Sequence, residues 1–513
     1  MLYYNSIMFR FYLKLNKKSI VAWAIMFAVQ FIWISDVLAK IPNDPKFSVQ
    51  KDFYSQIGAP LAWDFATGSE KVVVAIIDVG VDITHVDLKD NIWKNNKEIS
   101  GNNIDDDNNG YIDDINGWNF VENNNDPSIP VIKAADDSGA VNHGTLMAGL
   151  IGGKGDNNIL GAGLNWNVKI MALRAIDNEG GGALSDVARA VNYAVKNGAD
   201  IISLSFVGFT TDPDLTNALY QAYQKGVLVV AASGNNGTDN TGSANLTKVK
   251  QFPICLDHDY VENWVLGVAS VGLQDKLSDF ADYGSCIDIT APGEMIFSTQ
   301  KLAPEYGYTH DFNGPWFGTS FSAPLVAGSA ALVKSVRPDW GAKEIIDVLL
   351  RSADDIDSLN PGFAGQIGYG RLNVAKAVAM AMDSKKVIAP TAIMTTKLVK
   401  TGKSYSVQVL ENSKIVRSFP LINFSANLSK WNVSRNLFVY ARLSKNQVVV
   451  DVWDLLGNKK LNSLVLPGIK ALSGVQIEKL WGDSPNAVLS VKTSAGNQKI
   501  IVDIPSRSWK MEE

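Results

Sequence analysis

Cysteine and histidine are scarce in this chain of 513 residues, which contains two cysteines and four histidines. Two cysteines allow at most one disulfide bond within the chain. Four histidines leave few side chains that can act as a general base near neutral pH. The chain also lacks any nucleic-acid-binding motif, so nucleic acid is not an expected partner, and no motif points to an organic cofactor.

Lysine and arginine are absent from residues 101–126, which are instead rich in aspartate and asparagine. Aspartates so close together repel one another unless solvent or a cation offsets their charge. Asp105, Asp107 and Asn109 occupy the first, third and fifth positions of an EF-hand loop, and Asp113 occupies the ninth. The twelfth position holds an asparagine instead of the usual glutamate, so the match is partial. We expect structural calcium here, with a solvated acidic loop as the alternative.

The N-terminal residues have the pattern of a secretory signal peptide. Basic side chains up to Lys18 precede an apolar run over 19–34, and a cleavage-site pattern ends at Ala39. We expect residues 1–39 to be removed after export. The alternative is an uncleaved membrane anchor, although the run is slightly short for a span. The protein is therefore predicted to be secreted or to lie in the periplasm or cell envelope, with no stable membrane span after cleavage.

A serine lies between small residues where an apolar helix begins, in the segment Gly318–Pro324. Ser320 is therefore expected at a helix N-terminus, where unpaired backbone N–H groups favour a developing negative charge. Pro324 fits the first turn of that helix, where its missing N–H costs nothing. Taken alone, the segment is interpreted equally well as a helix cap.

Two further segments place a carboxylate and an imidazole at comparable positions. An apolar run over 72–77 predicts a buried strand that ends on Asp78, at the edge where open α/β sheets build their sites. His143 opens a predicted helix of small residues over 143–149. The alternatives are an aspartate that caps a turn and a hydrogen-bonded histidine, and the latter is how we interpret the other three histidines.

The order Asp78, His143, Ser320, with these flanking residues, resembles the subtilisin-like serine peptidases (subtilases, thermitase-like members), whose triad runs Asp, His, Ser along the chain. The likeness spans residues 41–382. It implies an exported serine endopeptidase that hydrolyses peptide bonds through an acyl-enzyme, with Ser320 as nucleophile, His143 as general base and Asp78 as the orienting carboxylate. It also implies Asn235 as the oxyanion donor, together with a backbone N–H.

The resemblance extends to the substrate, which the family holds as an added strand. Ser205, Phe206, Val207 and Gly208 stand where the family usually has Ser-Leu-Gly-Gly, so they are expected to bind a protein or peptide substrate. A valine in place of a glycine is expected to narrow the substrate cleft. The alternatives are a catalytically silent subtilase-fold scaffold or binding protein, and an esterase that uses the same triad.

The resemblance also implies a second calcium site and a disulfide bond. Asp44, Asp87 and Asn157 match positions that hold calcium in thermitase-like members, where the ion would fasten the N-terminal segment to the catalytic domain. The segments that carry Cys255 and Cys286 lie near each other in the family, and in an exported protein this predicts one bridge. The alternative is two separately buried thiols.

Alternating strand and helix patterns predict an α/β fold, with a parallel sheet covered by helices on both faces and a smaller C-terminal all-β domain. We expect a subtilisin-like domain over 40–384, a linker over 385–403 and a β-rich domain over 404–513. Most subtilases carry an inhibitory prodomain, and we expect no room for one between the predicted signal and Asp78. Either folding needs no such chaperone, or another segment or protein supplies this function. The strands are predicted at residues 72–77, 168–173, 201–204 and 227–231, and the helices between them at 185–197 and 214–225.

Charge is distributed unevenly along the chain. Residues 397–513 carry 17 basic and 8 acidic side chains, whereas residues 1–396 carry 30 and 44. The C-terminal domain could therefore meet an anionic surface, with a merely soluble face as the alternative. Similar segments at 446–451 and 497–503 also hint at a weak repeat of about fifty residues, which favours a small sandwich or an incomplete stack of blades.

Overall fold

The computed structural model describes residues 39–383 except 130–141, 239–241 and 259–262, together with the backbone of the strands between 394 and 511. The predicted signal peptide lies almost wholly outside the described residues, and so does the first half of the predicted linker. None of the helices in the described ranges is both long and apolar enough to cross a membrane.

A seven-stranded parallel sheet forms the centre of the larger part of the chain, with strand order β2-β3-β1-β4-β5-β6-β7. In this order β1 lies between β3 and β4, because the sheet grows first to one side of β1 and then to the other. Open sheets bind their ligands at the carboxyl ends of the strands where this reversal occurs. The strands are β1 (Gly68–Asp78), β2 (Gly117–Asn119), β3 (Asn167–Arg174), β4 (Ile201–Leu204), β5 (Leu228–Ala232), β6 (Leu266–Val271) and β7 (Ile289–Pro292).

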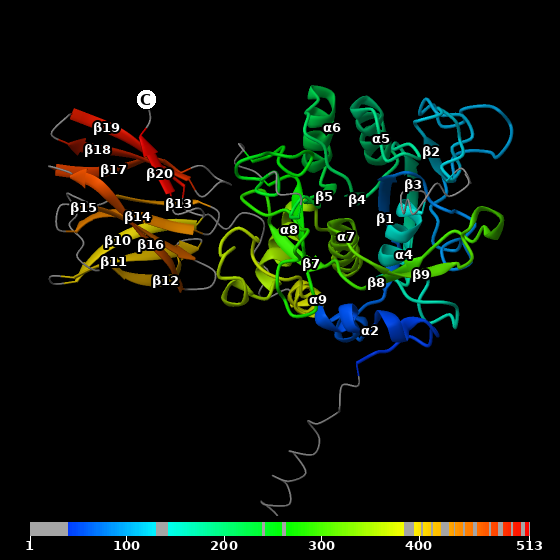
Figure 1. Ribbon diagram of the computed structural model, residues 1–513, viewed down its shortest axis with the longest axis horizontal. Coiled ribbons are helices and arrows are strands. Elements are labelled where there is room, and N and C mark those ends of the chain that lie inside the picture. Colours follow the sequence, from blue (N-terminus) through cyan, green and yellow to red (C-terminus); the bar gives the residue numbers. More distant parts are fainter. Residues whose placement is uncertain are drawn as a thin grey trace, which may run out of the picture. The chain divides into compact units, whose positions relative to one another are not determined.

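Helices cover both faces of this sheet, as predicted (Figure 1). Successive residues of β1 alternate between two apolar clusters: Val74 and Ile76 belong to one, and Ala75 and Ile77 to the other. Both faces are buried, which explains why the strand is a continuous apolar run rather than an alternating one. The first cluster includes residues of α2 (Phe47–Gln56), α3 (Ala59–Trp63), α4 (His143–Gly152), α7 (Thr319–Val336), α8 (Ala342–Ser352) and α9 (Val374–Met382), and the second those of α5 (Leu184–Lys196) and α6 (Pro213–Gln224).

A two-stranded hairpin precedes α7 and leads the chain into it. It consists of β8 (Ile296–Thr299) and β9 (Phe312–Trp316), which pair antiparallel. Ser298 and Thr299 of β8 donate to backbone oxygens of α4, both at 2.7 Å. The hairpin therefore joins the helix that begins at His143 to the segment that leads to Ser320. Two short 3-10 turns lie at Pro304–Tyr306 and Asp357–Leu359.

The part of the chain described after residue 393 contains eleven strands, which form three antiparallel sheets. The first strand begins at Met394, inside the segment predicted as a linker, because its backbone pairs with the next strand along its whole length. The two similar segments near 446–451 and 497–503 fall on the third strand of each four-stranded sheet. The strands are β10 (Met394–Thr401), β11 (Ser404–Glu411) and β12 (Lys414–Leu421), then β13 (Lys430–Ser434), β14 (Leu437–Ser444), β15 (Gln447–Asp454) and β16 (Lys459–Lys470), then β17 (Ser473–Leu480), β18 (Asn486–Thr493), β19 (Gly496–Asp503) and β20 (Ser508–Met511).

Candidate active site

Asp78 and His143 meet because α4 packs closely against the end of β1. Asp78 is the last residue of β1 and is 3% exposed, and His143 is the first residue of α4. The next residue is a glycine, Gly144, at which a Cβ atom would lie 2.1 Å from the backbone oxygen of Gly80. Only a residue without a side chain lets the helix start this near to the strand.

The imidazole of His143 is held by both oxygens of one carboxylate. Its Nδ1 lies 2.9 Å from Oδ1 and 2.9 Å from Oδ2 of Asp78. Burial lowers the pKa of His143, but the negative charge of Asp78 and the hydrogen bond to it outweigh burial, so the pKa is raised above its usual value. This contact turns Nε2, the other ring nitrogen, away from the carboxylate.

A buried arginine, which the sequence did not single out, supports the segment after Asp78. Arg174 is the register partner of Asp78 on β3 and is 1% exposed. Its Nε donates to the backbone oxygen of Val79 at 3.1 Å, and its Nη1 forms an ion pair with Glu122 at 2.9 Å. These contacts fix the turn that follows β1, so Arg174 holds the Asp78 carboxylate in place through the backbone.

Ser320 is the second residue of α7, as the sequence predicted for a serine at a helix N-terminus. Its hydroxyl donates to the backbone oxygen of Ser205 at 3.1 Å, and the hydroxyl of Ser205 donates to the backbone oxygen of Ser320 at 3.0 Å. Within the described residues, no hydrogen bond joins Ser320 to His143. The resting serine hydroxyl therefore points to Ser205 and must rotate before it can give its proton to an imidazole.

Asn235 lies beside the same helix N-terminus. Its Oδ1 accepts from the backbone N–H of Thr319 at 2.9 Å and from the Thr319 hydroxyl at 3.1 Å. Thr319 is thereby fixed too, because its hydroxyl also accepts from the backbone N–H of Gly234 at 3.1 Å. With its oxygen engaged in this way, the Asn235 carboxamide presents its Nδ2 donor beside Gly318, next to Ser320.

The predicted substrate-binding segment follows β4. Gly208 pairs with Phe252 through two backbone hydrogen bonds of 2.8 Å, so this end of the segment is anchored. Phe206 and Val207 are half-buried and pack against the apolar cluster that includes α5 and α6. The next residue, Phe209, is 60% exposed, which no sequence pattern indicated.

A sequence model of the subtilase family matches residues 69–370. The chain belongs to the subtilase family. This subtilase is 33% identical to thermitase of Thermoactinomyces vulgaris over 66% of its own length and 99% of the relative's. It is 31% identical to the halolysin-like extracellular serine protease Nep of Natrialba magadii, over 67% and 54% of the two chains.

Solved structures agree with the sequence relatives. A protease structure from Pseudoalteromonas arctica PAMC 21717 aligns with a TM-score of 0.53 and 29% identity, over 66% of this chain and 99% of that one. Membership of the family and these protease relatives make the subtilase a serine endopeptidase. It acts on protein or peptide substrates.

In the subtilase, hydrogen bonds join Asp44, Asp87 and Asn157. Asp44 accepts from the backbone N–H groups of Asp156 and Asn157 at 2.7 and 3.1 Å, and Asn157 donates to Oδ1 of Asp87 at 2.8 Å. Asp87 is 1% exposed, and its Oδ2 is buried without a hydrogen-bond partner among the described residues. Burial raises the pKa of Asp87 to about 7, and the charge of Asp44 adds to this effect.

The acidic loop brings two of the predicted residues, Asp105 and Asp107, together with a third carboxylate from outside the predicted pattern. Glu98, Asp105 and Asp107 each place an oxygen within 4.8 Å of the others. Asp113 instead accepts backbone N–H groups from residues 101–103, and Asn109 donates its side-chain N–H to another carboxylate, Asp114. Sequence reasoning missed Glu98 because it precedes the EF-hand-like pattern by seven residues.

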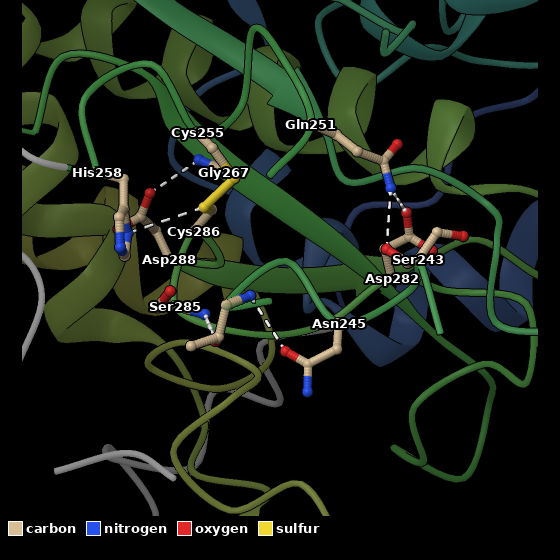
Figure 2. The surroundings of a disulfide bond; sticks show 11 residues. Ser243, Asn245, Gln251, Cys255, His258, Gly267, Asp282, Ser285, Cys286 and Asp288 are labelled. Atoms are coloured by element: carbon tan, nitrogen blue, oxygen red, sulfur yellow. Dashed lines mark hydrogen bonds between the residues drawn. A yellow bond between two sulfur atoms is a disulfide. The ribbon is translucent and has the colours of Figure 1, made fainter. Parts of the chain in front are cut away.

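The two cysteines of the subtilase form a disulfide bond, with an S–S distance of 2.03 Å (Figure 2). Cys255 follows Phe252, which pairs with the substrate-binding segment, and Cys286 lies shortly before β7. The bond therefore joins the segment between β5 and β6 to the segment between β6 and β7.

Proposed function

We propose that this subtilase is an exported endopeptidase that hydrolyses peptide bonds through Asp78, His143 and Ser320. The observation that carries the proposal is the contact of His143 Nδ1 with both oxygens of the buried Asp78 carboxylate, beside a serine at a helix N-terminus. This combination supplies a base, its orienting group and a nucleophile at one sheet edge.

The first half of the reaction forms an acyl-enzyme. The Ser320 hydroxyl turns from Ser205 toward Nε2 of His143, which takes the proton as Oγ bonds to the carbonyl carbon of the substrate. Asp78 keeps the proton on Nδ1 and stabilises the imidazolium by its charge. His143 then gives the transferred proton to the leaving nitrogen as the C–N bond breaks, and the acyl group remains on Oγ as an ester.

Negative charge develops on the carbonyl oxygen in the tetrahedral intermediate. The side-chain N–H of Asn235 and the backbone N–H of Ser320 are the donors that would bind it. Thr319 supports this role because it occupies Oδ1 of Asn235 and so orients the carboxamide. Donors fixed in advance stabilise the transition state without reorganising during the reaction.

The second half of the reaction regenerates the enzyme. A water molecule gives one proton to His143 as its oxygen attacks the acyl carbon. The ester bond breaks, His143 returns the proton to Oγ of Ser320, and the carboxylic acid product leaves. The substrate would lie as an added strand along Ser205–Gly208, where rotation of the serine hydroxyl frees the Ser205 carbonyl to accept a substrate N–H.

The proposal includes structural calcium at two places. Asp44, Asp87 and Asn157 would hold one ion, and the buried Asp87 oxygen without a partner fits a cation better than an apolar environment. Glu98, Asp105 and Asp107 would hold the other. Bound calcium would offset the charge of these carboxylates, and no chemical step requires it.

Location and the role of the C-terminal strands complete the proposal. Export is supported by the signal-like residues 1–39 and by an extracellular relative. The net positive charge of residues 397–513 supports an encounter with an anionic surface, which binding to anionic and neutral vesicles in parallel would test. Equal binding to both kinds of vesicle would contradict it.

Labelling with a fluorophosphonate probe tests the catalytic proposal. The wild type should be labelled and should cleave a peptide library, and Ser320→Ala should do neither. Ser329→Ala is the matched control, because Ser329 lies on the same helix and its hydroxyl donates to the backbone oxygen of Leu325. A wild type without label, or a Ser320→Ala variant that keeps it, would favour the silent scaffold. Faster turnover of a matched ester with no amide cleavage would favour an esterase.

A further inference from the structure

The carboxylate of Asp282 is fully buried and accepts hydrogen bonds from the turn that contains Asn235. Its Oδ1 accepts from the backbone N–H of Asn236 at 2.7 Å, and its Oδ2 accepts from the Asn236 side chain at 2.8 Å. Its own backbone N–H donates to the carbonyl of Gly234 at 3.1 Å. One residue therefore holds both neighbours of Asn235 in the chain.

The turn packs so closely against Asp282 that no side chain would fit at Gly234. Gly234 has a φ of 106°, and a Cβ atom there would lie 2.4 Å from Oδ2 of Asp282. Three residues further along, the backbone N–H of Gly237 donates to the backbone oxygen of Phe280 at 2.8 Å. The turn over 234–237 thus lies directly against the segment that ends at Asp282, and a change in that segment is transmitted to Asn235.

A second buried side chain, that of Gln251, donates a hydrogen bond to Asp282. The Nε2 of Gln251 donates to Oδ2 of Asp282 at 2.5 Å and to the backbone oxygen of Ser243 at 3.3 Å, and Gln251 is fully buried. Figure 2 shows the Gln251 and Asp282 side chains pointing toward each other. Each lies four residues before a cysteine of the disulfide bond, so the Cys255–Cys286 bridge fastens the two segments together.

We propose that Asp282 is a positioning residue for the oxyanion donor. It acts through the backbone on either side of Asn235, and the proposal rests on the proposed role of that asparagine. Thr319 orients the Asn235 carboxamide, but the side chain of Asn235 is exposed and its Cα position depends on the turn. The gain from an oxyanion donor depends on its exact placement, so the residue that fixes the turn contributes to the rate.

A carboxylate suits this position better than an amide. Among the described residues, two N–H groups of Asn236 and one of Gln251 donate to the two oxygens of Asp282. An ionised carboxylate can accept all three, whereas an asparagine would direct an NH₂ group at one of these donors. Asp282→Asn therefore keeps the shape of the side chain but replaces one acceptor oxygen with a donor, so that not all three hydrogen bonds can form.

The test combines Asp282→Asn with Asn235→Ala. Activity is expressed per active site titrated with a fluorophosphonate, and a peptide boronic acid probes the tetrahedral state. We expect Asn235→Ala to lower kcat by about a hundred- to a thousandfold, and Asp282→Asn by roughly tenfold, with KM changed less than about twofold. Affinity for the boronic acid should fall in parallel with kcat. In the double variant, Asp282→Asn should add little, because the donor that it positions is gone.

Two further variants separate positioning from general stability. Asp257→Asn also removes a buried carboxylate that accepts backbone N–H groups, here those of Trp264 and Val265. It should lower Tm and leave kcat per titrated site unchanged. If Asp282→Asn does not fold, Gln251→Met removes one donor with little change of shape and should give a smaller loss of kcat that again vanishes without Asn235.

The outcomes distinguish this inference from the proposed function. Unchanged kcat in Asp282→Asn, or a full further loss in the double variant, would overturn the positioning role while the catalytic proposal stands. Full activity in Asn235→Ala would remove the oxyanion assignment itself. Activity in Ser320→Ala would remove the catalytic proposal altogether.

Discussion

The hydroxyl groups of Ser205 and Ser320 each donate to the backbone oxygen of the other residue, at 3.0 and 3.1 Å. The pair joins the start of α7 to the substrate-binding segment. In the proposed reaction, the Ser320 hydroxyl must give up its hydrogen bond to the Ser205 carbonyl. The hydrogen bond from the Ser205 hydroxyl to the Ser320 carbonyl can remain. In this mechanism Ser205 would hold the helix N-terminus in place throughout turnover.

Ser205→Ala should cost about 1 kcal/mol of unfolding free energy through the lost hydrogen bond, and should lower kcat/KM by less than about tenfold. The backbone acceptor for Ser320 remains in this variant. Ser203→Ala is the control, because the buried Ser203 hydroxyl has no hydrogen-bond partner among the described residues. Denaturant unfolding and peptide cleavage measure both effects. A larger activity loss in Ser203→Ala than in Ser205→Ala would contradict the assignment.

The pH profile should report the raised pKa of His143. The neutral imidazole is the active base, so kcat/KM should fall as pH drops through this pKa. Because the pKa is raised, the fall should begin above the usual histidine value of about 6.5. Asp78→Asn removes both raising causes and leaves burial, so the fall should move to lower pH while kcat drops by about four orders of magnitude. A pH profile of kcat/KM that falls over the same pH range in Asp78→Asn as in the wild type would contradict this prediction.

Removal of calcium should destabilise the protein before it affects the chemistry. An ion present at about a hundred times its dissociation constant contributes about 2.7 kcal/mol. EDTA should therefore lower Tm by several degrees, and calcium but not magnesium should restore it. Asp87→Asn and Glu98→Gln should each lower Tm in calcium and weaken the effect of EDTA. The exposed Asp52→Asn should behave like the wild type, and a Tm that EDTA does not change would contradict both sites.

Gly144→Ala tests how closely α4 must approach β1. The added methyl group would meet the Gly80 carbonyl at 2.1 Å, so the helix start has to shift and carry His143 away from Asp78. We expect a loss of about 1–3 kcal/mol in stability and a fall in kcat that exceeds any change in KM. Gly362→Ala is the control, because a methyl group there meets open space. Equal effects of the two variants would contradict the packing argument.

The sequence predicted those features whose signal is local. Asp78, His143 and Ser320 each stand at the end of a strand or the start of a helix, and their short flanking motifs are readable without tertiary contacts. The parallel sheet could be predicted for the same reason, since its strands are uninterrupted apolar runs.

Features made by distant segments were not predictable in this way. Glu98 joins the acidic loop only because the chain folds back on itself, and Gln251 meets Asp282 across 31 residues. In the sequence, Arg174 simply follows the last residue of a predicted strand. Only the structure shows that its guanidinium donates to the Val79 carbonyl. Strand β10 lies within the predicted linker, and its pairing with β11, rather than its own composition, makes it a strand.

The order of the sheet also determines when proteolytic activity can arise. Asp78 and Ser320 are 242 residues apart in the chain, and α7 packs against β1 and against strands on the far side of the sheet, up to β7. A chain that has formed only its first strands has the carboxylate but neither the nucleophile nor the donor on the Asn235 turn. The appearance of peptidase activity during refolding should therefore report the docking of α7 against the sheet.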